Sequence, residues 1–101
     1  MYKMETREQK LKQQLKLLGD SSKQIAKSLL DMGIKGIPES MDSCPIANYL
    51  KRLRYKDVSV DIDYIDLETR SKIPFSLNEL PKACAKFIAD FDNEKYKNLI
   101  K

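Results

Sequence analysis

The spacing of the apolar residues changes twice along this chain, and this change constrains the fold more than any other feature. Up to about residue 54 the apolar residues recur three and four positions apart, which is the period of a helix buried on one side. From Val58 to Leu67 apolar and polar residues alternate, which is the period of a half-buried strand. Helical spacing returns at about residue 78. This order predicts an α+β fold with three N-terminal helices, a small antiparallel sheet of two or three strands and a C-terminal helical region.

Capping residues place the boundaries of the three N-terminal helices. The first helix is expected over residues 4–18, because Gly19 suits the left-handed position that follows a helix. The second helix is expected over residues 22–32, after serines that can cap its amide groups. The third is expected over residues 44–54, with Pro45 in its first turn, where the missing N–H costs nothing.

The alternating stretch predicts the sheet. Its phase slips at residues 64–65, so a turn at about residues 61–63, or a bulge, is needed to keep the apolar side chains on one face. A further short strand is expected over residues 72–75, and Pro74 favours an edge position because it has no N–H to donate. The last helix is expected over residues 78–91, which carry the most apolar helical face of the chain.

Three motifs in the chain resemble a small uncharacterised bacterial and phage domain family. They are Gly33-Ile34-Lys35-Gly36, the helix start Cys44-Pro45-Ile46-Ala47-Asn48-Tyr49-Leu50, and an ending with Phe87-Ile88, Phe91-Asp92, Tyr96 and Leu99. The resemblance covers about residues 20–100 and leaves out the N-terminal helix. It implies a compact α+β domain, and it brings no activity, cofactor or catalytic residue with it.

The N-terminal helix is the main candidate for contact with a partner. We divide the chain into an amphipathic helix in residues 1–19 and a compact α+β domain in residues 20–101. Leu11, Leu15 and Leu18 form a narrow apolar stripe that Met4 extends, typical of a helix that packs against a partner or its own copy. These three leucines are therefore expected to bind a protein partner or to form a homodimer. Packing on the domain and a solvated helix are the alternatives.

The chain contains no histidine, and this excludes several common kinds of enzyme. Catalytic sets that pair serine or cysteine with histidine are absent, as is histidine-ligated zinc. We expect no catalytic residue, no cofactor and no metal site, and a non-enzymatic protein-protein interaction module, such as an accessory or inhibitor protein of a phage or mobile element. The densest acids lack the glycine of a calcium loop and are expected on the solvent face of a strand: Asp61, Asp63, Asp66 and Glu68.

A second function follows from the distribution of charge. The chain has 19 Lys and Arg against 15 Asp and Glu, with a basic N-terminal half and an acidic middle that are expected on opposite faces. Four cations crowd the end of the third helix, where they complement its dipole: Lys51, Arg52, Arg54 and Lys56. Together with the basic N-terminal helix they are the candidate nucleic-acid-binding residues. In a helix-turn-helix, the turn between the two helices has about three or four residues. The loop over residues 33–43, between the second and third helices, is much longer, so this pair of helices departs from that DNA-binding motif.

A third hypothesis is a thiol-based redox sensor at Cys44. This thiol stands at a helix start, where unpaired N–H groups and the positive end of the dipole favour thiolate. The alternative is a cysteine that faces the core. Cys44 and Cys84 are expected to be free thiols, and they are the pair that could meet in space. No apolar run approaches the roughly 20 residues of a membrane helix, and no secretory signal is seen, so a soluble, cytoplasmic protein without membrane contact is expected.

Overall fold

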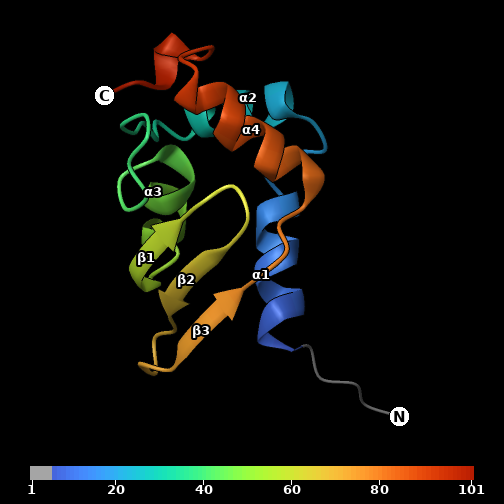
Figure 1. The fold of residues 1–101 in the computed structure, drawn as a ribbon, viewed down its shortest axis with the longest axis vertical. Helices are drawn as coiled ribbons and strands as arrows, with labels where there is room; N and C mark the ends of the chain where they lie inside the picture. Colours follow the sequence, from blue (N-terminus) through green and yellow to red (C-terminus); the bar gives the residue numbers. More distant parts are fainter. Residues whose placement is uncertain (1–5) are drawn as a thin grey trace.

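The computed structural model describes residues 6–101 and has four α-helices and a three-stranded antiparallel sheet. Figure 1 shows their order: α1 (Arg7–Lys16), α2 (Ser22–Asp31), α3 (Pro45–Arg52), β1 (Lys56–Val60), β2 (Ile65–Glu68), β3 (Pro74–Leu77), α4 (Lys82–Asp92) and the short 3-10 helix η1 (Lys97–Leu99). The predicted α+β fold, with three helices before the sheet and one after it, is confirmed. The expected start of the first helix at residue 4, and Met4 on its stripe, lie outside the described residues. Within residues 6–101 no helix is long and apolar enough to cross a membrane.

The sheet is an antiparallel meander in the order β1-β2-β3. A turn separates β1 from β2, as the phase slip predicted. A bulge is also present, because the register shifts between Lys56 and Ser59, and Asp57 has a φ of 49° there. Pro74 begins the edge strand β3, which agrees with its missing N–H.

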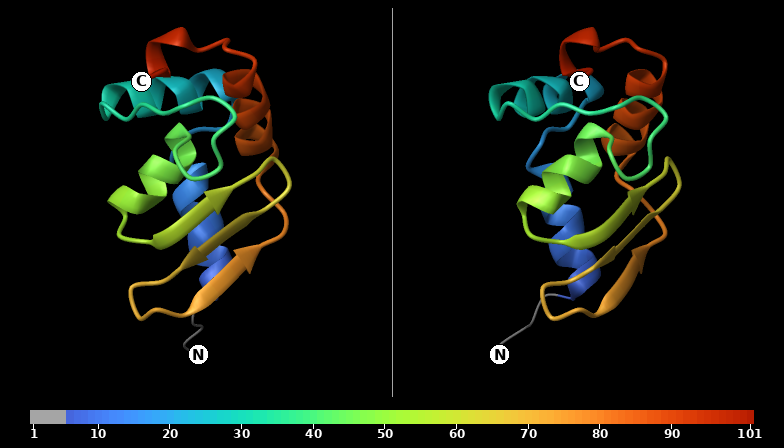
Figure 2. Two further views of the ribbon diagram at one scale, coloured as in Figure 1. Left: turned by 60° about the vertical axis from the view of Figure 1, so that its left-hand side comes forward. Right: turned by 90° about the vertical axis from the view of Figure 1, so that its left-hand side faces the viewer.

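One face of the sheet is buried and the other is open. Buried side chains from all three strands share one face: Val58, Val60, Ile65, Leu67 and Leu77. Figure 2 (left) shows α1 behind the strands, where it covers this face. The opposite face, which we call the open face, carries Asp66 and Ser76 exposed to solvent, with Ser59 and Glu68 partly exposed. At one end of the molecule α2, α4 and η1 pack together (Figure 1).

Helix α1 belongs to the core. Leu11, Leu15 and Leu18 are each only 1% exposed. The Tyr49 hydroxyl donates to the backbone carbonyl of Gln14 at 2.8 Å, and so binds α1 to α3. Packing of this helix on the rest of the chain was one of the alternatives that the sequence left open. Its apolar stripe is narrow because only one side of α1 meets the sheet and α3, while the other side stays in solvent.

Three helices end in the same way, with a left-handed residue after the last turn. Gly33 follows α2 with a φ of 71°, Arg54 follows α3 with a φ of 74°, and Glu94 follows α4 with a φ of 60°. After α3 the Tyr55 N–H donates to the Leu50 carbonyl at 3.2 Å, which closes a Schellman motif. Glycine adopts this conformation without the steric cost of a Cβ atom. Arg54 and Glu94 therefore occupy backbone positions that favour glycine.

Candidate functional site

One candidate site is a cleft of about 540 Å³ between α1, the end of α3 and the β2–β3 turn. The start of α1 and the β2–β3 turn lie at the same end of the molecule (Figure 1). We call this site the basic cleft and define it by the five cations that line it: Arg7, Lys10, Arg52, Arg54 and Arg70. The rest of the lining is apolar, aromatic or uncharged and polar: Leu11, Gln14, Leu53, Tyr55, Thr69, Ser71, Ile73 and Phe75.

The five cations come from three parts of the chain that the fold brings together. Two come from α1, two from the end of α3 and one from the β2–β3 turn. No acidic residue is among the described residues that line the cleft. Within residues 6–101, none of these cations forms an ion pair, because the ion pairs there lie elsewhere. Arginine and lysine carry their charge at neutral pH, so the described lining of the cleft holds five positive charges and no carboxylate.

The structure divides the four basic residues that the sequence singled out. Arg52 and Arg54 line the cleft, whereas Lys51 and Lys56 do not. Lys51 instead donates to the backbone carbonyl of Asp42. Arg52 is partly engaged as well, because its guanidinium donates to the Met32 carbonyl at 2.8 Å, at the end of α2. Of the two predicted cations that line the cleft, Arg54 is the one whose side chain forms no other hydrogen bond within residues 6–101.

Sequence reasoning placed part of the cleft correctly and missed one member. Arg7 and Lys10 belong to the basic N-terminal helix that was grouped with the end of the third helix. Arg70 closely follows the acids of residues 61–68, so charge along the chain grouped it with the acidic middle. Arg70 lies near α1 because the β2–β3 hairpin places its turn there. The pairing of Glu68 with Pro74 fixes the position of that turn, and no local sequence signal reports the distance from it to α1.

The uncharged wall of the cleft is ordered by hydrogen bonds. The Tyr55 hydroxyl donates to the side-chain oxygen of Gln14 at 2.6 Å, which fixes the ring against α1. Burial raises the pKa of Tyr55 above its ordinary value, so the hydroxyl remains a donor. Phe75 is partly buried and points from β3 to the same side of the sheet as the core. Two aromatic rings with restricted freedom therefore stand beside the cations.

The three leucines predicted to bind a partner are buried, whereas Leu17 beside them is exposed. Leu15 and Leu18 lie in the core, and so does Leu11, and none of them presents a surface to a partner. Leu17, between two of them, is 79% exposed. Helical spacing could not separate these residues, because a stripe that packs on its own domain has the same pattern as one that packs on a partner.

Cys44 is the N-cap of α3, as predicted, but its thiol is not activated. Its Sγ accepts from the Ala47 N–H at 3.4 Å, which favours thiolate. The side chain is only 5% exposed, however, and burial raises the pKa of Cys44 to about 11. Loss of solvation outweighs the helix N-terminus here, so the expectation of a lowered pKa is wrong. The thiol is expected to react more slowly at neutral pH than an ordinary cysteine.

Cys44 and Cys84 are both buried free thiols. Burial is the main cause that raises the pKa of Cys84 to about 12, and the charge of Cys44 is a smaller contribution to this rise. Both belong to the core cluster that α3 and α4 share, and we assign them a packing role.

The acidic residues of the chain's middle do not converge on a site. Asp66 and Glu68 are on the open face, and Asp61 and Asp63 lie in the β1–β2 turn. The Ser76 hydroxyl donates to Asp66, its cross-strand partner in the register. Within the part of the chain that the structure describes, no three histidine, cysteine, aspartate or glutamate side chains are placed to hold a metal ion.

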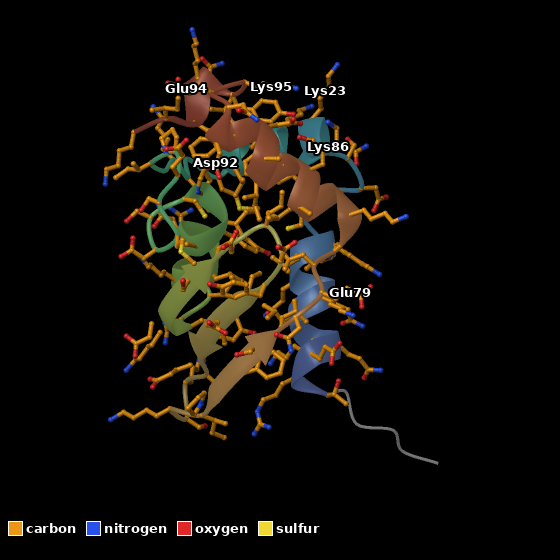
Figure 3. The ribbon with its side chains drawn as sticks, in the orientation of Figure 1. Lys23, Glu79, Lys86, Asp92, Glu94 and Lys95 are labelled. Carbon is orange, nitrogen blue, oxygen red and sulfur yellow. The ribbon has the colours of Figure 1, made fainter. Side chains whose placement is uncertain are left out.

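A buried polar network links α2 to the C-terminus, and sequence reasoning missed it. Asp90 is 7% exposed and accepts from the Ser22 hydroxyl at 2.8 Å. Tyr96 shares a hydrogen bond of 2.6 Å with Ser22, and Lys86 and Lys95 lie 3.4 and 3.2 Å from the Asp90 carboxylate. Figure 3 shows the two lysines at the end of the molecule opposite the start of α1. The hydrogen bond from Ser22 is the main cause that lowers the pKa of Asp90.

This network has a structural explanation. Ser22 and Asp90 are 68 residues apart, so no motif could have linked them. The carboxylate is hydrogen-bonded and balanced by two cations, and such a group holds elements together at little desolvation cost. Because the Ser22 hydroxyl donates to a carboxylate that no histidine accompanies, it is not arranged as a nucleophile.

Comparison with known proteins leaves the function open. No protein-family model, no curated protein and no solved structure matches this chain. The resemblance to an uncharacterised bacterial and phage family therefore stays a prediction. The basic cleft is the feature of the described chain from which a function can be argued.

Proposed function

We propose that this protein binds nucleic acid through the basic cleft. The observation that carries the proposal is the convergence of five cations on one hollow whose described lining has no acid. Phosphate groups are the ligands that such clusters of guanidinium and ammonium groups recognise, since arginine presents a planar fork of donors to their oxygen atoms. A nucleic acid supplies several phosphates at regular spacing, and each contact releases counterions.

The arrangement of the remaining charge favours the same ligand. The net charge is only +4, which is mild for a nucleic-acid-binding protein. Five of the 19 Lys and Arg line the cleft, whereas Asp66 and Glu68 lie on the open face. A field that is positive at one surface and negative at another orients an approaching polyanion. The local charge at the cleft, more than the net charge, is therefore expected to set the affinity.

The proposal is tested by fluorescence anisotropy with a labelled oligonucleotide of about 20 nucleotides, long enough to exceed one binding site. The cleft variant combines Arg7→Gln with Arg70→Gln. The matched control combines Lys23→Gln with Lys97→Gln, which removes the same charge from exposed positions outside the cleft. At about 50 mM salt the cleft variant is expected to bind roughly 30-fold more weakly, and the control within about threefold of the original chain.

Salt dependence provides the second readout. Each lost phosphate contact is expected to lower the slope of log affinity against log salt by about 0.7 for a single strand. All four substituted residues are exposed, so the thermal unfolding curves are expected to remain unchanged. Absence of binding at the lowest salt would overturn the proposal, and so would equal losses in the cleft variant and the control.

Non-enzymatic protein-protein interaction is the second candidate function, and the exposure of Leu17 favours it. A leucine that is 79% exposed at the C-cap of α1 is available to a partner, unlike the three buried leucines. Affinity purification with and without nuclease separates the two functions. A stoichiometric protein that survives nuclease and is lost with Leu17→Gln, but not with the cleft variant, would support interaction. Recovery that depends on nucleic acid would support the cleft.

A further inference from the structure

We infer that the basic cleft selects unpaired nucleotides, with the phosphates on its cations and a base against its aromatic wall. The inference rests on the proposed function and names the class of nucleic acid. Phe75 and Tyr55 lie in the same cleft as the cations. A ligand made of phosphates alone gains nothing from this wall, whereas a flat, partly apolar base can cover it.

The shape of the site argues against a double helix. Duplex sequences are read by an element that projects into a groove, most often a helix in the major groove. Here the cations surround a hollow of about 540 Å³ between α1, α3 and the hairpin turn, and a paired base inside a duplex cannot enter such a hollow. The volume falls within the roughly 300–1,000 Å³ of sites that hold small molecules. A single nucleotide turned out of a strand is an object of this size.

The wall is prepared for stacking before any ligand arrives. The Tyr55 hydroxyl is held by Gln14 at 2.6 Å, so its ring is fixed in place. Phe75 is anchored by the pairing of Leu67 with Phe75 in the sheet, and packs against the core. Ile73, next in the lining, is 38% exposed and extends the apolar surface to the edge of the cleft. Rings that are already ordered lose little freedom when a base stacks on them.

The cations are placed around this wall on more than one side. Arg54 directly precedes Tyr55 in the chain, at the end of α3. Arg70 reaches the cleft from the hairpin turn, and Arg7 from α1. A strand that placed one base on the aromatic wall would have its flanking phosphates near guanidinium groups from different elements. This combination of stacking and a charged groove is the usual basis of single-strand binding without sequence preference.

The experiment compares three probes on the full chain. They are a single strand of about 20 nucleotides, a duplex of the same sequence, and an abasic strand of equal length that keeps its phosphates. The original chain is expected to bind the single strand at least about tenfold more tightly than the other two, because stacking one base is worth about that factor. This comparison needs no variant, so a folding defect cannot affect it.

A substitution then assigns the stacking to the wall. Phe75→Leu keeps an apolar side chain and removes the ring, and Tyr64→Leu is the matched control outside the cleft. Phe75→Leu is expected to weaken single-strand binding about tenfold and to leave binding of the abasic strand unchanged. Equal affinity for all three probes would overturn the inference and leave nucleic-acid binding in place. Failure to bind any of them would overturn both.

Discussion

The basic cleft and the open face of the sheet are built partly from the same hairpin, yet the cleft is lined by cations alone among charged residues, whereas the open face has two acids beside Lys56, the register partner of Glu68. Asp66 and Glu68 of β2 lie on the open face, and Arg70, two residues after Glu68, lines the cleft. The alternation of side chains along a strand places neighbouring residues on opposite faces. A short hairpin can therefore separate charges that are close in the sequence. A count of charges along the chain thus underestimates how unevenly charge is distributed over the surface.

The two regions also differ in how their charges are balanced. On the open face Asp66 accepts a hydrogen bond from Ser76, which lies opposite it across the strands. In the cleft, cations from α1, α3 and the turn gather without an acid among the described lining residues. Bringing like charges together costs free energy unless a ligand or solvent neutralises them. This difference is why we assign binding to the cleft and a solvated role to the open face.

The largest expected effect concerns α1, because the cleft exists only if this helix packs on the sheet. Leu15→Ala removes a side chain that is 1% exposed and is expected to destabilise the fold by about 3 kcal/mol. Leu17→Ala is the control at the C-cap of the same helix, and because Leu17 is 79% exposed the expected change is within about 0.5 kcal/mol. Chemical denaturation followed by circular dichroism measures both.

The alternative outcome would change the comparison of the two regions. If Leu15→Ala left the free energy of unfolding unchanged, α1 would be a separate arm in solution. Arg7 and Lys10 would then not face Arg54, and the cleft would lose one wall. Equal losses for both substitutions would contradict the assignment of Leu15 to the core and of Leu17 to the surface.

The next effect separates binding from stability at Arg54. This residue has a φ of 74° at a position that favours glycine, so the chain bears a backbone cost to keep an arginine there. Arg54→Gly is expected to weaken binding of a single strand about tenfold, since it removes a charge-assisted contact. The same change is expected to stabilise the fold by about 0.5 kcal/mol, because glycine relieves the steric strain but adds freedom to the unfolded chain.

Lys72→Gly provides the matched control for Arg54→Gly. Lys72 has a φ of 61° in the β2–β3 turn and does not line the cleft. The substitution removes one positive charge and relieves similar strain, so stability is expected to rise equally while affinity falls less than about threefold. If both variants changed stability and affinity by the same amounts, the assignment of Arg54 to the ligand would be contradicted. Thermal unfolding and anisotropy on the same samples give the two quantities.

Much of the fold was predictable because local signals agree with it. The period of the apolar residues gave the helices and strands, and Pro45 and the serines before α2 marked two helix starts. The association of α1 was not predictable. Leu11 and Leu15 form a stripe that fits either a partner or the chain's own sheet, and the choice depends on how much sheet surface remains uncovered. That surface is a property of the whole fold.

The site was predictable only where its residues cluster in the sequence. Arg52 and Arg54 were found at the end of α3, whereas Arg70 required the register of the hairpin. For Cys44 the position was predictable, whereas the pKa of its thiol was not. Its position at a helix start was predicted correctly, but the effect of burial on its pKa exceeds that of the helix N-terminus. Local sequence shows which groups adjoin a thiol in the chain and says little about how far packing removes it from water.

The smallest expected effect concerns the open face. A substitution there tests whether its acids repel nucleic acid that is bound in the cleft. Asp66→Asn removes one negative charge and keeps an oxygen that can accept from Ser76, so the fold is expected to retain its stability. Affinity for a single strand is expected to rise about 1.5-fold at roughly 50 mM salt. The gain should vanish at about 200 mM, because charges separated by more than about 10 Å are screened there. A gain much larger than this that persists at about 200 mM salt would instead place the nucleic acid on the open face and reverse the assignment of the two regions.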